Sequence, residues 1–293
     1  MLKLSLFAGA VLAASCHSKT ATPEPASTTA PATPSLQTSA PNGSAALHVG
    51  AEAPAKNPPK APTPPYEGPC GRTPLRNATF KTDDDITLQA DYYPSGKAKS
   101  PAIVLLHMIP PNWDRTSYPP RLIEQLVAAG FSVLNLDRRG AGGSGGKAVD
   151  AYVGDKGALD VKAAVKFLGV QNCAYDASKL VLVGASNGTT SALDYAVDAQ
   201  PPLAGLVFMS PGPYTDKQHA FAKVKKQFAA TPILFMFPDA EREWPSAFQA
   251  AAPAGWKFLR FDGAAHGTKL FEARPISVEN LVTFATAAVS QTN

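Results

Sequence analysis

The sequence has little of the side-chain chemistry that metal centres need. Its 293 residues include three cysteines, which form no C-x-x-C pair, and five histidines, which do not cluster with the cysteines. Structural zinc sites need four such ligands at characteristic spacings. A glycine-rich stretch from Gly140 to Gly146 lacks the lysine and serine or threonine of a P-loop. We therefore expect no metal and no cofactor.

Long runs of one charge are also absent. The formal net charge is +4, from 27 lysines and arginines against 23 aspartates and glutamates, and these residues are spread along the chain. Proteins that bind nucleic acid concentrate their basic residues in runs or patches. We therefore expect no nucleic-acid partner.

No apolar run near the N-terminus is long enough to cross a bilayer. Lys3 precedes the short apolar segment LSLFAGAVLAA (4–14), the arrangement of an export signal. Residues 12–16 (LAASC) resemble the lipobox of bacterial lipoproteins, although Ala13 stands where that motif usually has a large aliphatic residue. We expect a signal peptide over 1–15 and a lipid anchor on Cys16, which would attach the protein to a membrane of the cell envelope. The alternative is ordinary cleavage and a periplasmic or secreted protein.

Residues 16–69 contain almost no aromatic or large aliphatic side chains and are rich in proline, alanine, threonine and serine. Such a segment buries too little apolar surface to offset the entropy of ordering, so we expect a disordered tether. The folded domain should then span residues 70–293. Cys70 and Cys173 are the cysteines left in an exported domain, so we consider a disulfide between them, although the sequence does not show that they are close.

Strand and helix patterns alternate after residue 70. Short apolar or β-branched runs predict strands at 78–81, 86–92, 102–106, 131–136, 180–183, 205–209, 232–237 and 256–261. Helical spacing of apolar residues predicts helices at 121–129, 158–168, 189–199, 218–228 and 277–289. This alternation predicts an α/β sandwich with a mostly parallel sheet, whose ligand site lies at the carboxyl ends of the strands.

The sequence GASNG (184–188) lies between one of these strands and a helix. This is the G-x-S-x-G pattern in the strand–turn–helix context that a nucleophilic serine needs. Ser186 would lie on a sharp turn with its hydroxyl exposed, and the N-terminus of the following helix would favour developing negative charge.

Four motifs together resemble the α/β-hydrolase family over residues 75–290. They are LLHM (105–108), LDRRGAGGSGG (136–146), GASNG (184–188) and GAAHG (263–267), in the family's order. The resemblance implies an α/β-hydrolase sandwich with helices on both faces of the sheet. Only about twenty residues separate the strands at 205–209 and 232–237, so we expect a minimal cap. Met108 departs from the family, which has glycine there.

The resemblance also implies the roles of individual residues. Ser186 would be the nucleophile and His266 the base, because the family's order is nucleophile, acid, histidine. The acid should follow the strand at 232–237, which leaves Glu241, favoured by the register of related enzymes, or Asp239. Backbone N–H groups of Asn187 and of the Met108–Ile109 loop would form the oxyanion hole. His107 would support that loop.

The leading functional hypothesis is a serine hydrolase that cleaves an ester or related acyl bond of a small-molecule or acyl-ester substrate, working as a monomer. Acyl transfer by the same triad is an alternative, because the sequence does not distinguish water from another acceptor. A third reading is a lipoprotein that keeps the fold as a non-catalytic binding or scaffold module, because fold alone does not establish chemistry.

Overall fold

A computed structural model describes residues 70–214 and 225–291 of the chain. The expected signal peptide, the lipidation site at Cys16 and the tether over 16–69 lie outside the described residues. So does most of the helix expected over 218–228, whose described end, Lys225–Phe228, is a 3-10 turn (η4).

The described residues are built around an eight-stranded sheet with the strand order β1-β2-β4-β3-β5-β6-β7-β8. Strand β2 runs antiparallel to both β1 and β4, and all the other neighbours are parallel. The strands are β1 (Leu75–Lys81), β2 (Thr87–Tyr93), β3 (Ala102–Leu106), β4 (Ser132–Asp137), β5 (Leu180–Ala185), β6 (Gly205–Met209), β7 (Ile233–Pro238) and β8 (Trp256–Phe261). The mostly parallel sheet predicted from the alternating pattern is confirmed.

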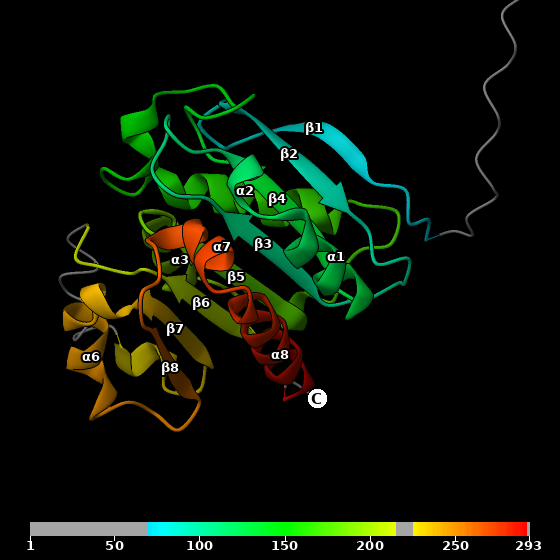
Figure 1. The fold of residues 1–293 in the computed structure, drawn as a ribbon. Coiled ribbons are helices and arrows are strands. Elements are labelled where there is room, and N and C mark those ends of the chain that lie inside the picture. The colour runs from blue at the N-terminus through cyan, green and yellow to red at the C-terminus, as the bar shows by residue number, and fades with distance from the viewer. Residues whose placement is uncertain (1–69, 215–224, 292–293) are drawn as a thin grey trace, which may run out of the picture. The chain divides into compact units, whose positions relative to one another are not determined.

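Helices cover both faces of the sheet (Figure 1). They are α1 (Pro120–Ala128), α2 (Lys156–Gly169), α3 (Gly188–Ala196), α6 (Glu243–Gln249), α7 (Leu270–Ala273) and α8 (Ile276–Ser290). Side chains alternate across each strand, so Leu180 and Leu182 of β5 pack with α2 and α3, whereas Val181 and Val183 pack with α1, α7 and α8. The central strands are therefore buried on both faces, as their continuous apolar runs require.

A disulfide joins Cys70, just before β1, to Cys173, which follows α2; their Cα atoms are 5.5 Å apart. This bond holds the first described residues next to the segment that connects α2 to β5. None of the helices within residues 70–214 and 225–291 is long and apolar enough to cross a membrane.

Candidate active site

The nucleophile candidate lies on a strained turn at the carboxyl end of β5. Ser186 has a φ of +50°, a left-handed conformation that residues other than glycine rarely adopt. Its backbone N–H donates to the carbonyl of Met209 at the end of β6, at 2.7 Å. A side chain at Gly188 would place its Cβ 2.4 Å from the carbonyl oxygen of Leu106, so glycine is required where α3 begins. The turn thus brings Ser186 and the N-terminus of α3 against the end of β3.

The base and acid candidates meet at the ends of the next strands. His266 lies in the loop after β8, and Glu241 lies in the 3-10 turn after β7, η5 (Asp239–Glu241). His266 Nδ1 and Glu241 Oε1 are 2.7 Å apart. Burial raises the pKa of Glu241, but the hydrogen bond from His266 and the nearby Ser210 hydroxyl outweigh burial, so the pKa lies below its usual value. An ionised Glu241 can only accept, so Nδ1 of His266 is the donor of this hydrogen bond.

Asp239, the alternative acid, has other partners. Its carboxylate pairs with Arg242 at 2.7 Å and with Arg260 of β8 at 3.3 Å. Within residues 70–214 and 225–291, Glu241 is the carboxylate that hydrogen bonds to His266. The geometry therefore favours Glu241 over Asp239 as the acid.

Tyr214, a residue that no sequence motif indicated, is a neighbour of the Ser186 hydroxyl. The hydroxyl of Tyr214 lies near that of Ser186 and donates to the carbonyl of Ser210 at 2.7 Å. Desolvation is the main reason that the pKa of Tyr214 is raised to about 12, so this hydroxyl is neutral at physiological pH. Tyr214 lies five residues after the end of β6 without a motif around it, so only the strand order reveals its proximity to Ser186.

His107 supports the loop after β3. It is fully buried, and its Nε2 accepts the backbone N–H of Arg138 at 2.9 Å, so Nδ1 carries the proton and donates to the Met108 carbonyl at 2.8 Å. Burial, with the charge of Arg138, lowers the pKa of His107 to about 3, which keeps the ring neutral. The Met108 carbonyl is thus turned into the interior. Because the following peptide bond is trans, the N–H of Ile109 points the opposite way, away from this buried network.

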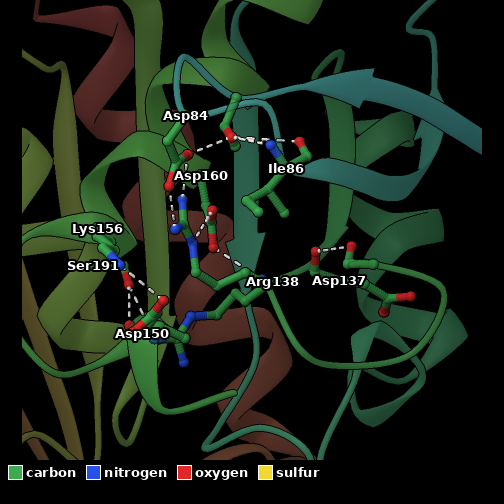
Figure 2. A network of polar contacts seen from close by, with 12 residues as sticks. Asp84, Ile86, Asp137, Arg138, Asp150, Lys156, Asp160 and Ser191 are labelled. Atoms are coloured by element: carbon green, nitrogen blue, oxygen red, sulfur yellow. Dashed lines mark hydrogen bonds and ion pairs between the residues drawn. The ribbon is translucent and has the colours of Figure 1, made fainter. Parts of the chain in front are cut away.

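Arg138 connects this loop to the nucleophile turn. It is fully buried, and its Nη1 donates to the Met108 carbonyl at 3.3 Å and to Asn187 Oδ1 at 3.0 Å. Its Nη2 donates to Ser191 Oγ of α3 at 2.9 Å (Figure 2). Burial lowers the pKa of Arg138 to about 10, so the guanidinium stays charged at neutral pH. One side chain thereby fixes both segments that were predicted to form the oxyanion hole.

The remainder of the LDRRGAGGSGG segment is structural. Asp137 accepts the backbone N–H of Gly143 at 2.8 Å and closes the glycine-rich turn. Arg139 pairs with Asp160 of α2 and with Asp84 in the β1–β2 turn, both at 2.8 Å. These contacts hold the turn after β4 against α2 and the hairpin. Nowhere in the two described ranges do three or more histidine, cysteine or carboxylate side chains gather as metal ligands would.

Comparison with known proteins agrees with this architecture. The family described as serine aminopeptidase, S33 matches residues 104–244, which include the nucleophile turn and Glu241. A search of curated proteins found no match.

Several solved structures superpose on the domain. An esterase from Pyrococcus furiosus is 20% identical, with a TM-score of 0.56 over 73% of this chain and 91% of its own. An alpha/beta hydrolase, GrgF, from a Penicillium species is 14% identical, with a TM-score of 0.57 over 74% and 99%. A dienelactone hydrolase from Anabaena variabilis is 16% identical, with a TM-score of 0.53 over 74% and 98%. The chain therefore has the α/β-hydrolase fold.

Proposed function

We propose that the protein is a serine hydrolase that cleaves an ester or related acyl bond through an acyl-serine intermediate. The observation that supports this most strongly is the hydrogen bond between His266 and Glu241 at the same sheet edge as the strained turn of Ser186. A serine hydroxyl is a weak nucleophile at neutral pH and needs an adjacent base whose orientation a third group fixes.

In the proposed reaction, Ser186 Oγ attacks the substrate carbonyl carbon while His266 Nε2 takes the hydroxyl proton. The tetrahedral intermediate collapses with cleavage of the carbon–oxygen bond, and the proton passes from His266 to the leaving alcohol. Water then attacks the acyl-serine, again losing a proton to His266, and the acid is released as the proton returns to Ser186. The negative charge of Glu241 stabilises the imidazolium that forms in each half-reaction.

Backbone amides would stabilise the oxyanion. The N–H of Asn187 follows the nucleophile, and the N–H of Ile109 points away from the buried network that holds the Met108 carbonyl. Each donor of this kind typically contributes about 3 kcal/mol in the transition state. Because Arg138 holds both segments, the two donors are positioned before substrate arrives.

Ester cleavage is the favoured activity because two of the similar structures are named an esterase and a dienelactone hydrolase. A lactone is a cyclic ester. The matching family is named for an aminopeptidase, so the amide of a peptide is the second candidate. Acyl transfer would use the same acyl-serine with another acceptor in place of water.

Labelling of the purified protein with a fluorophosphonate probe tests the proposal. We expect modification at Ser186, located by peptide mapping, and loss of labelling in Ser186→Ala and in His266→Ala. Ser277→Ala is a matched control, because Ser277 is a fully buried serine at the start of α8, away from the site. Wild-type labelling rates in either active-site variant would contradict the assignment. A folded wild-type protein that does not label would instead favour a binding module.

We also propose that the protein is exported and anchored through a lipid on Cys16. The disulfide between Cys70 and Cys173 supports export, because such bonds persist in oxidising compartments. Cys16→Ser should move the protein from the membrane fraction to the soluble fraction of the cell envelope. Unchanged membrane association of this variant would argue against the anchor.

A further inference from the structure

The strand order puts one more residue at the centre of the candidate site. β6 lies between β5, which ends next to Ser186, and β7, which leads to Glu241. Ser210 immediately follows β6, so it lies at the same sheet edge between the nucleophile and the acid. It is fully buried.

The backbone of Ser210 repeats the geometry of Ser186. Its φ is +48°, against +50° for Ser186. Its N–H donates to the Met236 carbonyl of β7 at 2.7 Å, just as the N–H of Ser186 donates to the last residue of β6 at 2.7 Å. A left-handed conformation at a residue other than glycine costs on the order of 1 kcal/mol and persists where the surrounding structure enforces it. The chain therefore turns sharply after both strands, with a serine at each turn.

The side chain of Ser210 contacts the segments that carry the base and the acid. Its Oγ accepts the backbone N–H of Gly267, the residue after His266, at 2.8 Å in a buried environment. A hydroxyl that accepts in this way still has its own proton to donate. The Glu241 carboxylate can only accept, and its Oε2 is buried without a hydrogen-bond partner among the described residues. The nearby Ser210 hydroxyl is one of the groups that lower the pKa of Glu241.

The carbonyl of Ser210 extends the same connection to the nucleophile. It accepts the Tyr214 hydroxyl at 2.7 Å, and that hydroxyl lies near the hydroxyl of Ser186. Ser210 thus touches, directly or through one side chain, the segments that carry all three proposed triad members.

We propose that Ser210 is a positioning residue of the active site. Its hydroxyl proton is the missing donor for the buried Oε2 of Glu241, while its oxygen accepts from Gly267. Ser210 thereby holds the carboxylate and the histidine loop in one arrangement and favours the ionised acid. This inference rests on the proposed hydrolase function for its catalytic consequence, but the hydrogen bonds that it invokes do not depend on turnover.

The other charged groups near Glu241 contact residues other than Glu241. Asp239, in the same turn as Glu241, pairs with Arg242, which lies just before α6. Arg260 of β8 also pairs with Asp239. Lys269, in the turn after His266, lies over the ring of Trp113, 5.1 Å from its centroid. His266, through its hydrogen bond, and the nearby Ser210 hydroxyl are the groups that lower the pKa of Glu241.

The test compares Ser210→Gly and Ser210→Ala with the full-length wild-type protein. Both variants remove the hydroxyl; glycine suits a φ of +48°, whereas alanine keeps the Cβ atom. The side-chain carboxyl of Glu241 is followed by NMR during a pH titration, with its signal assigned through Glu241→Gln. We expect its titration midpoint to move to higher pH in both variants, since a donor to the carboxylate is lost. Fluorophosphonate labelling at neutral pH should slow by about tenfold or more, because the histidine loop is less well positioned.

An unchanged Glu241 midpoint in either folded variant would overturn the proposal, even if labelling slowed, because a purely structural role would change the rate alone. Ser277→Ala should leave both the Glu241 titration midpoint and the labelling rate at their wild-type values. If the wild-type protein does not label, the proposed hydrolase function fails, whereas the Glu241 midpoint still decides the role of Ser210. If the glycine variant does not fold, the alanine variant gives the same reading.

Discussion

At the residue scale, the choice of acid can be tested with two substitutions that keep side-chain shape. Glu241→Gln removes the charge that orients and stabilises the protonated His266, and an amide at this position also allows the wrong imidazole tautomer. We expect labelling and ester hydrolysis to fall by roughly 10³- to 10⁴-fold. Asp239→Asn should change the rates by no more than about twofold, because its partners are two half-exposed arginines. Rates measured under identical conditions, with thermal unfolding as a check on folding, decide between the two.

Equal losses in the two variants would contradict this assignment. The sequence favoured Glu241 through the register counted from Pro232, but it left Asp239 open because both follow the same strand. The structure separates them because η5 turns the chain, so that Asp239 meets Arg260 of the neighbouring strand whereas Glu241 meets His266. Ser210 and Tyr214 were missed for a related reason: no motif surrounds them, and their proximity to Ser186 depends on the position of β6 in the sheet.

At the scale of elements, the β1–β2 turn is tied to the turn after β4 by Asp84 and Arg139, 2.8 Å apart. The hydrogen bond from Arg139 is the largest reason that the pKa of Asp84 falls from 3.8 to about 2. A depressed pKa in the folded state contributes stability above the unfolded value, and that stability is lost as pH falls from about 4 to about 2. Because Asp84 is about one-third exposed, we expect Asp84→Asn to cost only about 1 kcal/mol at pH 7.

The deficit of the same variant should be much smaller at pH 2, where about half of the wild-type carboxylate is protonated. Denaturant unfolding at both pH values measures the difference, and an equal deficit at pH 7 and pH 2 would rule out the ion pair as its cause. Asp83→Asn is the matched control, since Asp83 occupies the same turn and pairs with Lys162 on the surface. The strands expected at 78–81 and 86–92 leave room for only a short turn between them, but the attachment of this turn to Arg139, more than fifty residues later, is a tertiary contact.

At the scale of the whole molecule, the alternating pattern of the sequence predicted the fold because buried parallel strands need continuous apolar runs. Boundaries moved by only a few residues; for example, the helix expected at 158–168 extends over Lys156–Gly169. Two short helices, α6 and α7, were not predicted. Their seven and four residues are too few to show a helical period, so they form through packing against the sheet rather than through propensity.

The disulfide provides the last prediction at this scale, because it separates stability from activity. Cys70 and Cys173 are 103 residues apart, so the bond restricts a large loop of the unfolded chain and should contribute about 2–5 kcal/mol. Cys173 lies before the start of β5, whereas Ser186 follows its end, so the bond and the candidate active site are at opposite edges of the sheet. The double variant Cys70→Ser/Cys173→Ser should therefore unfold at a temperature lower by roughly 5–15 °C. Its rate of Ser186 labelling at 25 °C should stay at the wild-type value. A slower labelling rate in the folded variant would mean that the hairpin and the segment before β5 transmit strain to the nucleophile turn. An unchanged unfolding temperature would mean that packing alone holds the first described residues in place.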